Sequence, residues 1–469
     1  MRYVSTRGDA PVLGFADVLL TGLARDGGLY VPVEWPRLSA DQIAGFRGRP
    51  YANVAETVLA PFVGDDIAPD ALRRMIDDAY GTFRHPAIAP LLQVAPNQFI
   101  LELFHGPTLA FKDVAMQLLA RMMDHVLAAR GARATIVGAT SGDTGGAAID
   151  AFRLSKRVDI FILFPDGRVS DVQRRQMTTV GGDNIHALAI DGTFDDCQAL
   201  VKGMFNNHAF RDQVALSGVN SINWARIMAQ AVYYFTSATT LGAPERTVSY
   251  SVPTGNFGDV LAGHVAKHMG LTIDRLVVAT NVNDILRRAL ETGRYDVGGV
   301  EKTQSPSMDI QVSSNFERLL FEAGGRDAAT VARQMDTLKQ SGGFGIAGEA
   351  LARIRAEYDA HTTDEARTGE TMARLLADTG YLSDPHTAVG YHAAEACDTG
   401  ESPMVTLATA HPAKFPDAVR AATGITPALP EGLADLMERR ERMTHLANDQ
   451  SAVETFIRSS SRAAALETA

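Results

Sequence analysis

Residues 134–152, ATIVGATSGDTGGAAIDAF, decide the fold class of this chain. A β-branched run opens the stretch, a loop of small and hydroxyl-bearing residues follows, and a helical pattern closes it. The same plan recurs in four other stretches, residues 184–205, 247–269, 275–290 and 403–422. Strands that alternate with helices predict an α/β fold with mainly parallel sheets covered on both faces. Ligands of such folds bind outside the carboxyl ends of the strands, where these loops fall.

The chain changes character outside these units. Residues 1–90 lack the glycine-rich strand exits, and we expect them to form a small, separate N-terminal domain. The boundary falls within HPAIAPLLQVAPNQFILELF, residues 85–104, where prolines interrupt the pattern. Residues 91–430 then form the α/β core. Residues 431–469 are charged and later alanine-rich, and we expect a C-terminal helical extension there.

Composition limits the classes of partner. The chain has 469 residues and a formal net charge of −11, which argues against a nucleic-acid partner. Its start lacks the apolar core of a signal peptide, and no run reaches the roughly 18 apolar residues that span a bilayer, so no membrane partner is expected. The cysteines, Cys197 and Cys397, stand far apart, and a reduced, cytoplasmic protein is the simplest explanation. The 12 histidines show no metal-binding spacing, so no metal is expected.

A lysine stands out in LFHGPTLAFKDVAMQLLARMMDHVL, residues 103–127. Lys112 opens an almost wholly apolar helix, where a cation faces the positive end of the macrodipole. The apolar residues recur at helical spacing, so we expect the helix to be buried. Because the charged ammonium form is unfavourable at this position, the lysine is converted to its neutral amine more easily. The alternative is a solvated lysine that points outward.

Two glycine-rich loops, GATSGDTGG at 138–146 and PTGNFGD at 253–259, are candidate anion sites. Each is also compatible with a tight strand-to-helix connection. Neither loop contains GxGxxG or GxxxxGK[ST], so no dinucleotide fingerprint or P-loop is predicted. Together with Lys112 and the hydroxyl-bearing strand exit LATAHPAKF, residues 407–415, they match the needs of pyridoxal phosphate. That cofactor requires an amine, backbone donors for its phosphate and a partner for the pyridine nitrogen.

Separated motifs in a fixed order extend this match over nearly the whole chain. They are YVSTRG (3–8), LARDGGLYVP (23–32), HGPTLAFKD (105–113), GATSGDTGGAA (138–148), NSINWARI (220–227), VPTGNFGD (252–259), SPSMDIQVSSNFERL (305–319) and TAHPAKFPDAV (409–419). In these motifs the chain resembles the threonine synthase family, in its long bacterial and fungal branch, among the fold-type II pyridoxal-phosphate enzymes. The resemblance implies a core like that of the tryptophan synthase β subunit, with two open, mainly parallel α/β subdomains behind the small N-terminal domain.

The resemblance also implies roles for residues around the cofactor. Lys112 is similar to the lysine that forms the Schiff base, and Asp113 favours the helix start. Asp143 lies where many relatives carry asparagine, beside the cofactor ring, and helix capping is its alternative role. Thr409 resembles the hydroxyl that meets the pyridine nitrogen, the alternative being an ordinary strand-end threonine. The loop similar to the one that wraps the cofactor phosphate consists of Thr254, Gly255, Asn256, Phe257 and Gly258.

Substrate contacts are implied for two further segments. The hydroxyl-bearing residues Thr140, Ser141 and Thr144 match the segment that grips the substrate carboxylate. Arg226 can bind a phosphate in a forked, charge-assisted geometry, and an exposed ion pair is its alternative role. The residues that match the stretch for the substrate phosphate are Asn220, Ser221, Asn223 and Arg226. Three further residues could either line the edge of the same pocket or pack within their loops: His386, His411 and Lys414.

The activity that the resemblance implies is the conversion of O-phospho-L-homoserine and water to L-threonine and phosphate, the last step of threonine biosynthesis. A rival interpretation is a pyridoxal-phosphate-dependent lyase that releases phosphate and ammonia and forms a 2-oxo acid. A cofactor-binding protein without turnover is a more distant alternative. The sequence leaves the oligomeric state open between monomer and homodimer.

Overall fold

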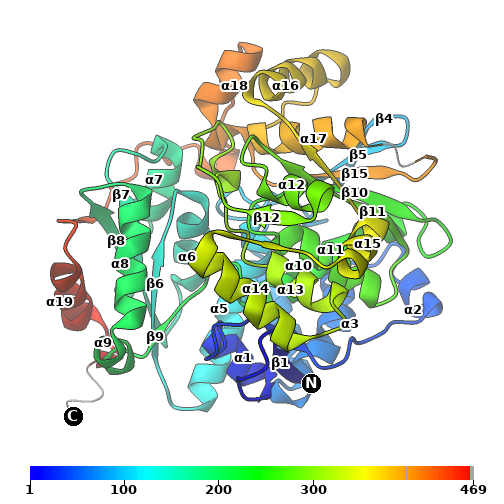
Figure 1. Ribbon diagram of the computed structural model, residues 1–469. Helices are drawn as coiled ribbons and strands as arrows, with labels where there is room; N and C mark the ends of the chain where they lie inside the picture. Colours follow the sequence, from blue (N-terminus) through cyan, green and yellow to red (C-terminus); the bar gives the residue numbers. More distant parts are fainter. Residues whose placement is uncertain (398–399, 465–469) are drawn as a thin grey trace.

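A computed structural model describes residues 1–397 and 400–464. Two sheets of mainly parallel strands form the core, with helices between them and on their outer faces (Figure 1). The larger sheet has six strands in the order β14-β11-β10-β15-β5-β4, and only β4 runs antiparallel to its neighbour. Its strands are β4 (Leu91–Ala95), β5 (Gln98–Glu102), β10 (Val248–Pro253), β11 (Ile273–Thr280), β14 (Tyr358–Thr362) and β15 (Met404–Ala408).

The smaller sheet has five strands in the order β16-β8-β7-β6-β9, all parallel. Its strands are β6 (Ala134–Ala139), β7 (Val158–Pro165), β8 (Ile185–Ile190), β9 (Leu216–Ser217) and β16 (Thr444–Leu446). Strands β6 to β9 come from the part of the chain between β5 and β10, so the two α/β units are interleaved. The parallel α/β architecture therefore agrees with the prediction from the strand-loop-helix stretches.

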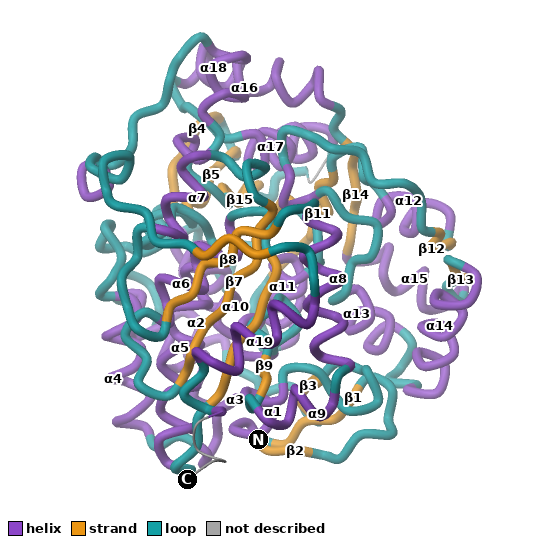
Figure 2. The backbone as a smooth tube through the Cα atoms, turned by 90° about the vertical axis from the view of Figure 1, so that its left-hand side faces the viewer, coloured by secondary structure: helices purple, strands orange, loops and turns teal. Residues whose placement is uncertain are grey.

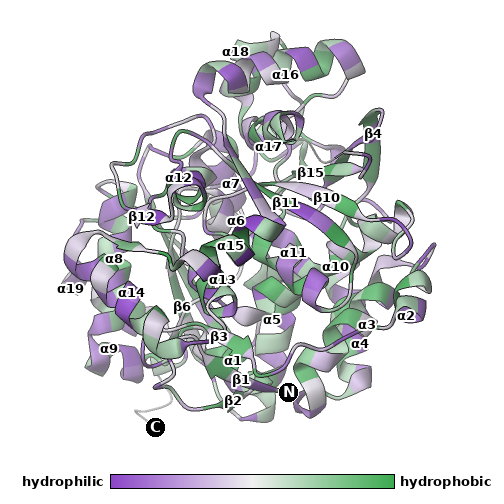
Figure 3. Ribbon diagram, turned by 45° about the vertical axis from the view of Figure 1, so that its right-hand side comes forward, coloured by the Kyte–Doolittle hydropathy of each residue, from purple (hydrophilic) through white to green (hydrophobic). Residues whose placement is uncertain are grey.

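Helices fill both sides of each sheet. In the six-stranded sheet α17 packs on one face, with α16 and α18 outside it, while α10 and α11 lie on the other (Figures 1 and 3). Hydrophilic residues are frequent on outer helices such as α9 and α14 (Figure 3). The helices are α5 (Lys112–Ala129), α6 (Asp143–Phe152), α7 (Asp171–Thr178), α8 (Phe194–Asn206), α9 (His208–Gln213), α10 (Trp224–Thr240), α11 (Gly258–His268), α12 (Ile285–Thr292), α13 (Phe316–Ala323), α14 (Ala328–Ser341), α15 (Gly348–Glu357), α16 (Glu365–Thr379), α17 (Pro385–Ala396), α18 (Pro416–Thr423) and α19 (Gln450–Ser460).

Short elements complete the core. A two-stranded ribbon pairs β12 (Arg294–Asp296) with β13 (Gly343–Gly345). Two 3₁₀ turns approach the lysine helix α5, η2 (Pro306–Met308) and η3 (Pro412–Lys414), and two others lie elsewhere, η1 (Gly64–Asp66) and η4 (Glu431–Leu433).

The N-terminal segment packs directly on the core. Its elements are β1 (Arg2–Ser5), β2 (Leu13–Gly14), α1 (Phe15–Thr21), β3 (Tyr30–Pro32), α2 (Ala40–Ala44), α3 (Tyr51–Val63) and α4 (Pro69–Tyr80). The buried ring of Trp224 in α10 lies 6.0 Å from Tyr3 and 5.7 Å from Phe62, centroid to centroid. Burial of each such ring contributes about 1.5–3 kcal/mol to folding. One apolar core thus joins both parts, and a domain boundary at residue 90 stays a prediction.

The C-terminal segment differs from the expected helical extension. Residues 444–446 form β16, which pairs in parallel with β8 at the edge of the five-stranded sheet, and α19 is the only regular α-helix within residues 431–464. Helix α19 then packs beside α8 (Figure 2). A strand of three residues carries no readable periodicity, so the sequence did not reveal this pairing. Within residues 1–397 and 400–464, no helix has the length and apolar character needed to cross a bilayer.

Candidate active site

Lys112 lies where the carboxyl ends of strands from both sheets meet. The N–H of Phe111 donates to the carbonyl of Thr409 just beyond β15, at 2.8 Å, and this bond fixes the start of α5. The Lys112 side chain is 10% exposed, and its Nζ lies 3.5 Å from Asp143 Oδ2 and 3.5 Å from Ser307 Oγ. The outward-pointing alternative for Lys112 is therefore wrong.

The protonation of Lys112 depends on competing effects. Burial lowers the pKa of this amine, the carboxylate of Asp143 opposes the lowering, and the cations of Lys414 and Arg226 reinforce it. The net result is a lowered pKa, because a buried ammonium loses hydration. The amine needed for imine chemistry is therefore easier to reach here than in an exposed lysine.

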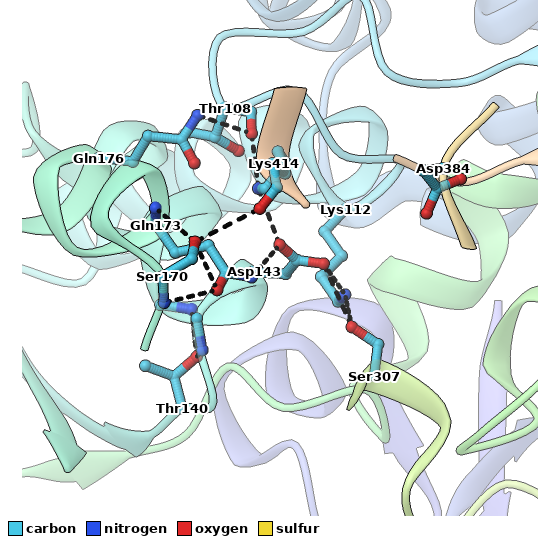
Figure 4. A network of polar contacts seen from close by, with 12 residues as sticks. Thr108, Lys112, Thr140, Asp143, Ser170, Gln173, Gln176, Ser307, Asp384 and Lys414 are labelled. Atoms are coloured by element: carbon cyan, nitrogen blue, oxygen red, sulfur yellow. Dashed lines mark hydrogen bonds and ion pairs between the residues drawn. The ribbon is translucent and has the colours of Figure 1, made fainter. Parts of the chain in front are cut away.

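Asp143 is the first residue of α6, and its carboxylate is the centre of a buried network (Figure 4). Oδ1 accepts from Lys414 Nζ at 2.8 Å and from Gln173 Nε2 at 3.0 Å, and Oδ2 accepts from Ser307 Oγ at 3.1 Å. Burial alone would raise the pKa of Asp143, but the ammonium groups of Lys414 and then Lys112 hold it well below its usual value. Asp143 is thus an anion that faces Lys112. The alternative role as a helix cap is wrong, because the N-cap is Gly142 and no side chain caps it.

The loop before Asp143 allows α7 to come close. Gly142 has a φ of +141°, and a Cβ there would lie 2.4 Å from Cδ of Gln173. Thr140 Oγ1 accepts from the N–H groups of Gly142 and Gly145, both at 2.9 Å, so this hydroxyl oxygen supports the loop from inside. Ser141 and Thr144 are partly exposed in the same loop. A substrate role for Thr140, Ser141 and Thr144 stays a prediction.

The second glycine loop, residues 254–258, leaves main-chain donors free. The N–H groups of residues 255–258 donate no hydrogen bond to any described part of the chain. Phe257 adopts a left-handed φ of +61° and is held there by the ring of Phe316, 5.5 Å away, so α11 starts at Gly258. A Cβ on Gly255 would lie 2.7 Å from the carbonyl oxygen of Ser307, which explains the glycine. Free amides at a helix N-terminus form an anion site.

Arg226 provides a second anion-binding group. This residue lies in the first turn of α10 and is buried, so the exposed ion pair considered from the sequence is wrong. Its Nη1 donates only a long bond of 3.4 Å to Val219, and its buried Nε has no partner in the described structure. Burial lowers the pKa of Arg226 to about 10, which still leaves a cation at neutral pH. A buried cation with an unused donor is suited to an anionic ligand.

Asn223 differs from the expectation. Both polar atoms of its fully buried side chain are engaged, because Nδ2 donates to Leu19 at 2.9 Å and Oδ1 accepts from Ala225 N–H at 3.0 Å. Asn223 therefore caps α10 and ties it to the N-terminal segment, and the structure does not place it for substrate binding. Asn220 is exposed and Ser221 half-buried just before this cap, and their role stays a prediction.

The three residues left open by the sequence separate clearly. Lys414 belongs to the network around Asp143. His386 is one contact away: its Nδ1 pairs with Asp384 at 2.7 Å and its Nε2 accepts from the N–H of Ser307 at 3.3 Å. His411 caps η3 instead, and burial, with Arg84 and His105, lowers its pKa to about 4. His411 is therefore a neutral packing residue.

Comparison with known proteins decides the family. The family model described as pyridoxal-phosphate dependent enzyme matches residues 83–335, between models described as threonine synthase N terminus, residues 2–80, and threonine synthase C-terminal, residues 387–457. A threonine synthase of Pseudomonas aeruginosa is 54% identical over 459 residues, which cover 97% of this chain and 98% of that protein. The chain belongs to the threonine synthase family.

Solved structures agree with this membership. A structure described as PLP-bound threonine synthase from Brucella melitensis matches with a TM-score of 0.97 and 63% identity, over 98% of this chain and 100% of that one. Threonine synthase from yeast matches with a TM-score of 0.93 and 37% identity, over 98% of each chain. The predicted fold type and family are confirmed, and the chain is a pyridoxal-phosphate-dependent enzyme.

The residues present fit the cofactor of the threonine synthase family. A buried amine at Lys112 stands beside a loop whose four amides lack acceptors, which is the donor set that an aldehyde with a phosphate tail requires. Thr409 is buried at the exit of β15, next to the lysine helix. Its contact with the pyridine nitrogen stays a prediction.

Sequence reasoning missed two residues of this threonine synthase site. Ser307 touches both Lys112 and Asp143, and it was present in the quoted motif SPSMDIQV without being assigned. Gln173 closes the capping box of α7 with Ser170 and also donates to Asp143. No motif marks Gln173, because only the tertiary packing brings it to the site.

Proposed function

We propose that this chain converts O-phospho-L-homoserine and water to L-threonine and phosphate. The observation that carries the proposal is the placement of the buried Lys112 amine between Asp143 and Ser307, beside a loop with free amides. The threonine synthases that cover nearly the whole chain support this choice of reaction. A cytoplasmic location, and the choice between monomer and homodimer, stay predictions.

Lys112 would serve as the mobile proton carrier. Bound pyridoxal phosphate supplies an aldehyde for the amine and a ring that withdraws electrons. With substrate bound, the free nitrogen of Lys112 would accept protons from the neighbouring substrate carbons and return them. A base for this purpose works best when its pKa lies near the working pH, and the lowered pKa of Lys112 moves in that direction.

The two anion sites would hold the two phosphates. The amides of residues 255–258 suit the fixed phosphate of the cofactor, because a preformed loop needs no reorganisation. The buried guanidinium of Arg226 suits the phosphate of the substrate. Since that phosphate leaves, a cation there stabilises the charge that develops in the transition state as well as the bound substrate.

The test compares Lys112→Ala with the unmodified chain. Both proteins are first mixed with pyridoxal phosphate alone, and their visible spectra are recorded. O-phospho-L-homoserine is then added, and phosphate, threonine and 2-oxobutyrate are measured. We expect threonine and phosphate in equal amounts from the unmodified chain, and neither product nor the imine absorption from Lys112→Ala. Arg226→Met should keep the imine absorption and lose phosphate release.

Two results would contradict the proposal. Imine absorption that persists in Lys112→Ala would move the cofactor link to another lysine. Formation of 2-oxobutyrate in place of threonine by the unmodified chain would favour the rival lyase, which the same lysine and loops would serve equally well.

A further inference from the structure

A second lysine lies deeper than Lys112 in the same network. Lys414 is fully buried, and its Nζ donates to Asp143 Oδ1 at 2.8 Å and to the carbonyl of Thr108 at 2.8 Å. The amine of Lys112 is farther from the same carboxylate, at 3.5 Å, and shares Oδ2 with Ser307. One buried carboxylate therefore lies between two lysines, and the shorter ion pair joins it to Lys414 (Figure 4).

The position of Lys414 is firmly set. It ends the 3₁₀ turn η3, which His411 caps by accepting from the N–H of Ala413. Its other acceptor, Thr108, is held by Asp113, which accepts from the N–H of Thr108 at 2.7 Å and from its hydroxyl at 2.6 Å. Gln176 Nε2 donates to the same Thr108 carbonyl at 3.0 Å. The ammonium of Lys414 is therefore fixed by protein acceptors, and its contacts among the described residues give no sign that it binds a ligand.

We propose that Lys414 is a positioning residue that neutralises Asp143 and so leaves the Lys112 nitrogen free to lose its proton. The inference rests on the proposed role of Lys112 as the cofactor lysine. Opposite charges in a poorly solvated site attract far more strongly than in water. Without Lys414, the nearest cation available to the Asp143 carboxylate would be Lys112, and their ion pair would keep Lys112 as an ammonium.

Other groups act on this site without contacting Asp143. Arg226 from α10 lowers the pKa of Lys112, and His386 from α17 lies one contact away, where its Nε2 accepts from the N–H of Ser307. The charge of Lys112 also lowers the pKa of Asp259 in α11, against the larger effect of burial. None of these groups is changed in the variants below, so differences between the variants report on Lys414 and Asp143.

The experiment measures the protonation of Lys112 directly. The full-length chain, freed of cofactor, is mixed with pyridoxal phosphate at a series of pH values, and the rate of imine formation is followed by absorbance. The neutral amine is the nucleophile, so the rate rises through the pKa of Lys112. The proteins are the unmodified chain, Lys414→Met, Asp143→Asn and the double variant, with Lys112→Ala as the blank.

The expected midpoints move in opposite directions. Lys414→Met should raise the midpoint by about one pH unit or more, which makes imine formation about tenfold slower below it. Asp143→Asn should lower the midpoint, because Lys112 loses its anion. The double variant should return close to the unmodified chain. The exposed Lys156→Met serves as the control for loss of a lysine and should shift nothing.

A midpoint that stays in place in Lys414→Met, or that Asp143→Asn raises, would overturn the inference. If Lys414→Met does not fold, as judged by circular dichroism, Lys414→Gln takes its place, because it removes the charge, can still donate to the carbonyl of Thr108, and should raise the midpoint in the same way. Failure of the proposed function gives a different result, because Lys112→Ala would then form the imine as fast as the unmodified chain.

Discussion

Asp143 and Asp259 occupy equivalent places in two strand-loop-helix units, yet their surroundings are opposite. Each is a buried aspartate in the first turn of a helix that follows a glycine-rich loop, α6 in one case and α11 in the other. Asp143 faces Lys414 and Lys112, and these cations hold its pKa well below the usual value against the effect of burial. Asp259 faces neutral groups, and burial raises its pKa to about 7.

The neighbours of Asp259 are two tyrosine hydroxyls: Tyr233 donates to Oδ1, and Tyr234 donates at 2.9 Å to the main-chain carbonyl and lies 3.3 Å from Oδ1. The buried Oδ2 has no partner in the described structure. Both aspartates gain from the positive end of a helix dipole. That gain does not offset burial at Asp259, so contact with a buried cation, and not the helix start, decides which aspartate is ionised. Asp143 thus provides a fixed negative charge beside Lys112, whereas Asp259 is a neutral hydrogen-bond acceptor at the start of α11.

The largest expected difference between the two aspartates is in stability. Asp143→Ala should lower the free energy of unfolding by about 3–5 kcal/mol, because it leaves the ammonium of Lys414 buried without its partner. Asp259→Ala should cost about 1–3 kcal/mol, since it leaves the buried, neutral hydroxyl of Tyr233 without an acceptor. Urea unfolding of the cofactor-free chain at pH 6 measures both. Equal losses would show that Asp143 is not held as an anion.

Two glycines of the loop at residues 254–258 should differ in how they tolerate an added methyl group. Gly255→Ala places a Cβ 2.7 Å from the carbonyl of Ser307, and such overpacking costs about 1–3 kcal/mol. We expect affinity for pyridoxal phosphate to fall about 10- to 100-fold in titrations followed by absorbance. Gly258→Ala is the matched control, because its nearest neighbour, Asn315 Nδ2, lies at an ordinary 3.5 Å. A weaker loss of affinity in Gly255→Ala than in Gly258→Ala would contradict the proposal that this loop binds the cofactor phosphate.

The pH dependence of stability should follow Asp259. Its pKa is about 7 in the folded chain and near 3.8 when unfolded, so its neutral form favours folding, and this contribution is lost as pH rises through 7. Between pH 6 and 8 the loss is about 1.4 kcal/mol for one group. Asp259→Asn should show a correspondingly flatter profile in urea unfolding over this range. An unchanged slope in Asp259→Asn would contradict the raised pKa of Asp259.

The smallest effect concerns the support of the Asp143 network. Ser170 caps α7 in a box with Gln173, whose amide also donates to Asp143. Ser170→Ala should lower the free energy of unfolding by about 1 kcal/mol, the usual loss for a helix cap. Ser39 closes a similar box with Gln42 at exposed α2, so Ser39→Ala is the control. Only Ser170→Ala should also slow imine formation. If both variants form the imine equally fast, α7 does not support the Asp143 network.

The sequence predicted the features that repeat or that lie close together in the chain. Alternating strands and helices indicated the parallel sheets, and Lys112 was located from its place in an apolar helix. Features set by distant residues were not predictable in this way. The position of Asp143 at a helix start favours a capping role, and only the fold brings Lys414 to it. Asn223 belongs to a motif with Arg226, but its buried side chain is used by the carbonyl of Leu19.

The contact of Tyr3 and Phe62 with Trp224 has a consequence for synthesis on the ribosome. The opening strand leaves the exit tunnel long before α10 has been made, and its apolar side chains must wait for that helix. Chain segments that wait in this way are open to wrong associations. A shortened gene that omits residues 1–63 would remove Tyr3 and Phe62 from the ring of Trp224, so we expect the lysine-bearing core made alone to expose apolar surface there and to aggregate.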